Sequence, residues 1–199
     1  MECPCGAGSS CPLLGRFSFS VGPEHMPPRL VVCLFAVWLV TMPSWAESSA
    51  DLVQKGEAAL ASHDGVSAMQ SFDKALELDP TNGFAAFDRA KMLMKVGEER
   101  AAIADFTIAI IADPKNVAAF DGRGEAKMKL PQPDTSGAFA DFQSGIDSAP
   151  DRPEPLLVRA SYYLQLGNVA AALKDMENAR KVADPETADA ITKMLDKFN

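Results

Sequence analysis

Cysteine, tryptophan and histidine are scarce in this 199-residue chain, and most of them lie near its start. A disulfide needs two cysteines, and a zinc site needs several cysteine or histidine ligands. Beyond residue 33 there is no cysteine, so neither a disulfide nor a thiolate metal site can form there. We therefore expect no metal and no cofactor. The residues concerned are Cys3, Cys5, Cys11, Cys33, Trp38, Trp45, His25 and His63.

Positive charge is also in short supply. The chain has 19 basic and 27 acidic residues, which gives a formal net charge of −8 at pH 7. Nucleic acids and anionic membrane surfaces attract proteins through a concentrated positive field. The charge balance therefore argues against both as partners.

Catalytic motifs are missing as well. His63 is followed by Asp64, but adjacent side chains on a turn do not converge easily, so we expect His63 to be an exposed turn residue. Gly122 and Gly124 resemble part of a phosphate-binding loop, yet no strand precedes them and no third glycine follows. We interpret them as helix-packing glycines. The sequence predicts that the protein is not an enzyme.

Long apolar runs are limited to residues 30–40, which are 11 consecutive apolar residues. A membrane-spanning helix needs about 20. Arg29 precedes the run, and Ser44 and Ala46 place small residues three and one before Glu47. These features are typical of a secretory signal peptide, here residues 26–46, cleaved between Ala46 and Glu47. The mature protein would then be periplasmic or secreted, with no stable membrane span.

Two alternatives to a cleaved signal stay open at this point. One is an uncleaved membrane anchor. The other is lipid attachment at Cys33, which the bulk of Val32 and the short apolar stretch before it disfavour. Met26 would begin a compact leader, so we expect residues 1–25 to be a non-native or disordered extension.

A pattern of small residue, aromatic, small residue and proline recurs through the rest of the chain. Its proline-to-proline distances are 34 and 36 residues, far longer than the 3.6-residue period of one helix. Each copy holds two apolar runs at helical spacing, separated by a turn and ended by the proline, which cannot continue a helix. The copies are Ala68, Phe72, Ala75, Pro80; Ala102, Phe106, Ala109, Pro114; and Ala138, Phe142, Gly145, Pro150, with a weaker fourth at Ala172, Met176, Ala179, Pro185.

This pattern resembles the tetratricopeptide repeat (TPR) family, in its bacterial secreted or periplasmic form. Gly56 and Gly124 match the family's first-helix glycine, and Gly97 and Gly167 match its turn between the two helices. The resemblance implies an all-α, right-handed α-solenoid of about four helix-turn-helix repeats. The expected repeats within residues 47–186 are 49–82, 83–116, 117–152 and 153–186, followed by a C-terminal capping helix at 187–199.

One departure from the family pattern is an insertion in the third repeat. Residues 131–134, Pro-Gln-Pro-Asp, add two residues to the third repeat. We interpret them as a longer turn, which is either a tolerated insertion or a contact loop.

The resemblance also implies a non-catalytic scaffold or assembly factor of the bacterial cell envelope, which binds a protein or peptide in a concave groove. The alternatives are a regulatory subunit of an envelope enzyme complex and a self-associating structural repeat protein, and the oligomeric state stays open. Phe84 and Phe87 are either exposed anchors or core residues. The groove positions that the family implies are Phe84, Phe87, Lys91, Met94, Lys95, Asp121, Glu125, Met128, Lys129, Leu157 and Ser161.

Overall fold

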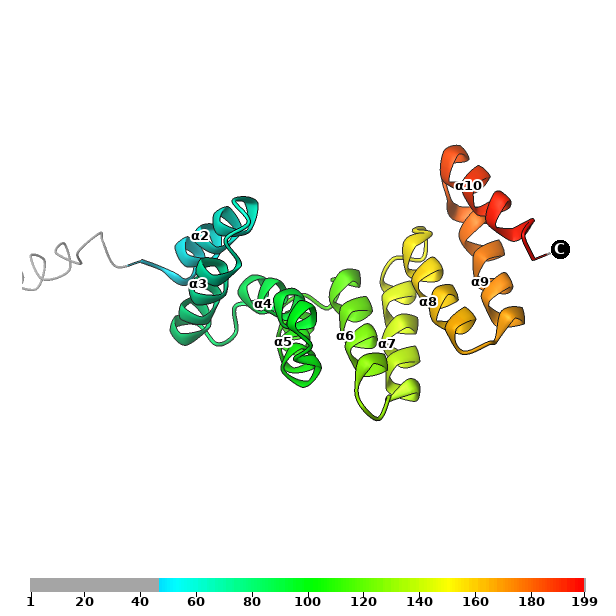
Figure 1. The fold of residues 1–199 in the computed structure, drawn as a ribbon. Coiled ribbons are helices and arrows are strands. Elements are labelled where there is room, and N and C mark those ends of the chain that lie inside the picture. The colour runs from blue at the N-terminus through cyan, green and yellow to red at the C-terminus, as the bar shows by residue number, and fades with distance from the viewer. Residues whose placement is uncertain (1–46, 199) are drawn as a thin grey trace, which may run out of the picture. The chain divides into compact units, whose positions relative to one another are not determined.

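The computed structural model describes residues 47–198, which form helices and no strand. The predicted extension, signal peptide and residue Ala46 lie outside the described residues. The helices follow one another in hairpins (Figure 1). They are α2 (Ser49–Ala61), α3 (Gly65–Leu78), α4 (Gly83–Val96), α5 (Glu99–Ala112), α6 (Val117–Lys129), α7 (Thr135–Ser148), α8 (Glu154–Gln165), α9 (Val169–Val182) and α10 (Pro185–Leu195).

The helices pair as the repeat pattern predicts. α2 packs on α3, α4 on α5, α6 on α7 and α8 on α9, and each hairpin also contacts the next one along the chain. This arrangement confirms the predicted fold class, an all-α solenoid of helix-turn-helix repeats with a C-terminal helix. Pro80, Pro114 and Pro150 each follow the end of a second helix, where a proline is tolerated.

Local side chains fix where the helices begin. Asn82 accepts hydrogen bonds from the backbone N–H groups of Phe84 and Ala85 at the start of α4, at 3.1 and 3.0 Å. Asn116 accepts one from the Ala119 N–H at 3.0 Å at the start of α6. Such caps satisfy N–H groups that have no partner within the helix. The asparagine that follows the proline in these two repeats therefore sets where the next first helix begins.

Three large aromatic side chains, Phe72, Phe106 and Phe142, are almost completely buried. The phenyl ring of Phe72 lies against Gly56 of its own hairpin, where an added Cβ would be 2.5 Å from the Phe72 Cε1 atom. Phe142 lies against Gly124 in the same way and also stacks on Tyr162 of the next hairpin, with ring centroids 5.0 Å apart. The phenylalanines thus fill space within hairpins as well as between them.

An arginine on the first helix of each of the last three hairpins joins two repeats. The Nε and Nη2 atoms of Arg159 donate to the two carboxylate oxygens of buried Asp175 on α9, at 2.7 and 2.8 Å, and Nη1 donates to Gln143 on α7. Arg89 links Asp105 to Asp73 in the same geometry. Arg123 links Asp141 to Thr107. Bidentate arginine–carboxylate pairs are strong and directional, so these residues hold the hairpins in register.

The last helix, α10, covers the end of the array. It packs on α9 and buries Ile191 and Leu195 against Met176, Ala179 and their neighbours. Asp184 caps it and Pro185 occupies its first turn. The helix therefore begins two residues before the predicted range of 187–199.

Candidate functional site

The predicted groove residues lie on the first helices of successive repeats. Because α4 contacts α6 and α6 contacts α8, these helices are neighbours, and side chains that point away from the second helices share one surface. We call this surface, formed by α4, α6 and α8, the first-helix face. The structure brings the predicted residues of the three repeats onto these three adjacent helices.

In the second repeat the two aromatic residues have different surroundings. Phe84 is 79 % exposed at the start of α4. Phe87 is half-buried and packs edge-on against Phe106, with ring centroids 6.0 Å apart. Phe84 is thus free to contact a partner, whereas Phe87 contributes mainly to the core of its hairpin.

The lysines of this repeat also differ. Lys91 lies 5.1 Å above the centroid of the Phe87 ring, and its Nζ is 3.1 Å from an Asp88 carboxylate oxygen. Lys95 is exposed and forms no ion pair within the described residues. Lys95 is therefore the lysine of the pair whose charge is available to a ligand. Met94, between them, is half-buried in the core of the second repeat.

In the third repeat Asp121 stands where the neighbouring repeats carry the apolar residues Phe87 and Leu157. Its Oδ1 atom is buried, has no hydrogen-bond partner among residues 47–198, and faces Gly145, where an added Cβ would be 3.2 Å away. Burial raises the pKa of Asp121 to about 6, although the positive charge of Arg152 opposes the shift. This carboxyl group therefore titrates much closer to neutrality than an ordinary aspartate.

The remaining predicted residues, on α6 and α8, are half-buried or form contacts within the protein. Glu125 and Lys129 form an ion pair of 2.7 Å along α6, and Met128 is half-buried. Leu157 is half-buried against the core of the fourth repeat. The Ser161 hydroxyl is exposed and donates to the Val158 carbonyl oxygen at 2.7 Å.

Burial raises the pKa of nearby Tyr162, which was not among the predicted residues, to about 12, and the charges of Glu125 and Asp121 add to the shift.

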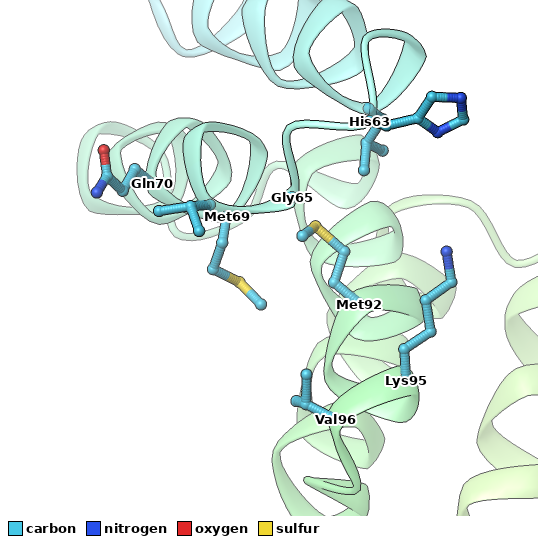
Figure 2. A pocket seen from close by; sticks show the side chains of 9 residues that line it. His63, Gly65, Met69, Gln70, Met92, Lys95 and Val96 are labelled. Atoms are coloured by element: carbon cyan, nitrogen blue, oxygen red, sulfur yellow. The ribbon is translucent and has the colours of Figure 1, made fainter.

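A pocket of about 610 Å³ lies between the second helix of the first repeat, α3, and the first helix of the second, α4. In Figure 2, Met69 of α3 and Met92 of α4 point toward the space between the two helices, and Val96 lies further along α4. We call this feature the α3–α4 pocket. It is lined by Leu60, His63, Gly65, Val66, Met69, Gln70, Met92, Lys95 and Val96.

The walls of the α3–α4 pocket are mostly apolar and open to water. Val66 and Val96 are 71 % and 69 % exposed, which is unusual for side chains that normally lie inside a protein. The imidazole of His63 points away from the pocket (Figure 2), and the residue has a positive φ of 62°. His63 is exposed in the turn between α2 and α3, as the sequence predicts.

Sequence reasoning missed most of this pocket, since only Lys95 was among the predicted residues. The signal that would have pointed to it is a pair of valines at two different helix ends, the start of α3 and the end of α4. Val66 begins the second helix of one repeat and Val96 ends the first helix of the next, positions at which a polar residue would be expected in a solvated helix. Which residues face these valines depends on how the first two hairpins stack, and the sequence does not specify that stacking.

We also searched the described residues for a metal-binding cluster and for a membrane-spanning helix. Within residues 47–198, no three His, Cys, Asp or Glu side chains lie close enough together to hold a metal ion. None of the helices in this part of the chain is both long enough and apolar enough to cross a bilayer. The arrangement offers exposed apolar side chains and an unpaired lysine, which can bind another molecule by contact.

The fold and its repeated hairpins are those of TPR proteins. No family model matches the chain. Among solved structures, the segment of MamA from position 41 onward from Desulfovibrio magneticus RS-1 is similar, with a TM-score of 0.61 and 19 % identity over 68 % of this chain and 75 % of that one. TTC0263, a thermophilic TPR protein from Thermus thermophilus, has a TM-score of 0.58 at 18 % identity, and the match covers 74 % of this chain and 81 % of that one.

A third similar structure is a TPR protein from Parabacteroides merdae ATCC 43184. Its TM-score is 0.56 at 22 % identity over 75 % of this chain and 60 % of that protein. At these identities the similarity establishes the fold.

Proposed function

We propose that this protein is a non-catalytic scaffold of the TPR family, which binds a protein or peptide through the first-helix face. Repeat arrays of this kind generally bind partners along an extended surface. The observation that carries the proposal is Phe84, an aromatic side chain that is 79 % exposed on the first helix of the second repeat. Exposed aromatic residues are frequent anchors of binding energy when a partner buries them.

The experiment compares two exposed apolar residues of the same hairpin. Phe84→Ser removes the proposed anchor, whereas Ile111→Ser changes a residue of α5 that is 75 % exposed and lies outside the first-helix face. Both variants should keep the helical circular dichroism spectrum, because neither side chain is part of the core. Proteins recovered with the tagged chain from its native cells are compared by quantitative mass spectrometry.

We expect a specific partner to be depleted at least fivefold in the Phe84→Ser sample and retained in the Ile111→Ser sample. A partner that both variants recover as well as the natural chain would contradict the proposed face. Depletion by Ile111→Ser alone would place binding on the second helices instead.

We further propose that the mature protein acts in the bacterial envelope, either as an assembly factor or as a regulatory subunit of an enzyme complex. The support is the signal-like segment at residues 26–46. Cell fractionation followed by N-terminal sequencing tests this location. The expected result is a periplasmic protein that begins at Glu47, and a cytoplasmic protein with an intact leader would contradict it.

Self-association is a second candidate function, favoured by one observation. Met194 in α10 and Phe198 just after it are 38 % and 45 % exposed, although Ile191 and Leu195 of the same helix are buried. A second copy packed there would bury them. Sedimentation equilibrium over a hundredfold concentration range should then show a dimer that Met194→Lys disrupts, whereas a monomer throughout excludes this candidate.

A further inference from the structure

We propose that the α3–α4 pocket is a separate binding site, which accepts an aliphatic side chain of a peptide that carries Asp or Glu next to that side chain. The inference rests on the proposed function in one respect, namely that the ligand is a polypeptide. It differs in place, because α3, a second helix, lines the pocket together with α2 and α4, although Lys95 belongs to both sites.

The lining of the pocket selects for an apolar group. Leu60, Val66, Met69, Met92 and Val96 supply its walls. Methionine side chains are unbranched and polarisable, so Met69 and Met92 can adapt to aliphatic groups of different shape. Gly65 adds no side chain to the lining, and a Cβ there would have only the Met92 methyl carbon within 4 Å, at 3.8 Å.

The exposure of the pocket walls favours a peptide over a free small molecule. Its volume falls within the roughly 300–1,000 Å³ of ligand sites, but such sites usually enclose most of a small ligand. Here two of the walls, Val66 and Val96, are more than two-thirds exposed. An open site of this kind suits one side chain that is held in place by contacts elsewhere along a longer ligand.

The charge of the lining indicates which kind of residue stands next to the aliphatic side chain in the ligand. Lys95 is the one residue with a permanent charge in the lining, and it forms no ion pair within the described part of the chain. Its side chain runs alongside Met92 (Figure 2). The acidic residue beside the lining in sequence, Asp64, accepts hydrogen bonds from Ser67 at the start of α3, at 3.0 Å from its backbone N–H. Asp64 keeps its negative charge but does not line the pocket, so the lining itself carries the single positive charge of Lys95, which complements a carboxylate.

The test uses the methionine methyl groups as reporters. The protein is labelled with ¹³C-methyl methionine and titrated with the peptide Ser-Gly-Asp-Leu-Glu-Gly-Ser. The comparison peptides replace the two acids with lysines or the leucine with serine. The signals of Met69 and Met92 should shift and saturate with the acidic leucine peptide. Binding should be about three- to fivefold weaker for the lysine peptide, as expected for one exposed ion pair, and should be lost for the serine peptide.

Matched variants separate the pocket from the rest of the array. Val66→Glu should abolish the shifts, whereas Leu78→Glu should leave them unchanged, because Leu78 lies on the same helix and is 60 % exposed but does not line the pocket. Lys95→Glu should reverse the order of the acidic and lysine peptides. Both Val66→Glu and Leu78→Glu should retain the fold, since they change exposed side chains.

Several results would overturn the inference. The first is that Met69 and Met92 show no shift at millimolar peptide. The second is that the shifts are the same whatever the charge at position 95. The third is that the shifts depend on protein concentration without peptide, which would mean that a second copy fills the pocket. Shifts at Met94 and Met128 alone would also overturn it while supporting the first-helix face. The proposed function would fail separately, through the Phe84→Ser comparison.

Discussion

Gly56 lies directly beneath the phenyl ring of Phe72, so closely that a Cβ at position 56 would be 2.5 Å from the ring. The same relationship joins Gly124 to Phe142 two repeats later. In the second repeat Ala90 takes the glycine's place, and in the fourth Ala160 faces the slimmer Met176. The Phe106 ring of the second repeat instead lies against Gly122 of the next hairpin, so a first-helix glycine adjoins each of the three buried phenyl rings.

This relationship predicts that Gly124→Ala destabilises the fold. Alanine favours a helix over glycine by about 1 kcal/mol, but the buried ring has no room to move, and overpacking costs about 1–3 kcal/mol. We expect the free energy of unfolding in urea to fall by up to about 2 kcal/mol once the two effects are combined. Gly65→Ala is the control, because its Cβ meets only one flexible methyl group and should not lower stability.

The arginine links predict an asymmetry between repeats. Asp141 is held by Arg123 and also by Lys127, at 2.8 Å, whereas Asp175 has Arg159 as its salt-bridge partner. Arg159→Met should therefore lower the free energy of unfolding by about 3 kcal/mol, since it strands a buried carboxylate. Arg123→Met should cost clearly less. Equal losses in denaturant unfolding would show that Lys127 does not compensate.

The turn at His63 predicts a stabilising substitution. His63 has a φ of 62°, and glycine occupies the corresponding turn position at Gly97 and Gly167, with φ of 81° and 74°. Left-handed backbone costs a residue with a Cβ about 1–2 kcal/mol, part of which the greater freedom of unfolded glycine offsets. We expect His63→Gly to raise the midpoint of thermal unfolding by a few degrees. Ser62→Gly, at a negative φ, should not raise it.

Asp121 predicts a stability that increases on acidification. Because burial raises its pKa from 3.8 to about 6, the folded state binds a proton more tightly than the unfolded state between these values. Its contribution to the free energy of unfolding therefore grows as the pH falls from 7 to 4. We expect about 1–2 kcal/mol, after allowance for the part of the side chain that water screens.

The variant Asp121→Leu, which copies the residue of the fourth repeat, isolates this effect. It should be more stable than the natural chain at pH 7.5, and the difference should shrink at pH 4. A difference that is constant with pH would contradict the proposed titration. Asp184 should show the opposite pH dependence. Hydrogen bonds from Thr187 and Glu186 lower its pKa, so the loss of stability in Asp184→Ala should be largest above pH 4.

The fold was predictable because its signals are local or periodic. Pro80 and Pro114 stop helices, and Phe72 and Phe106 recur with the period of the repeat whatever their neighbours. The candidate site was harder to predict, because exposure depends on how hairpins stack. Phe84 and Phe87 differ by three positions on one helix, and it is Phe87 that packs on the ring of Phe106.

The same limit explains what sequence reasoning missed. Arg159 and its partner Asp175 are 16 residues apart, and nothing in the sequence indicates that they pair. The α3–α4 pocket combines Met69 and Met92 from different repeats. Such features require the geometry of two packed helices.

Hydrogen–deuterium exchange of the protein, alone and with its captured partner, tests the central claim most directly. Amide protection that increases in α4, α6 and α8, with α5, α7 and α9 unchanged, is the expected result for a polypeptide bound on the first-helix face. Protection confined to the second helices would contradict the account.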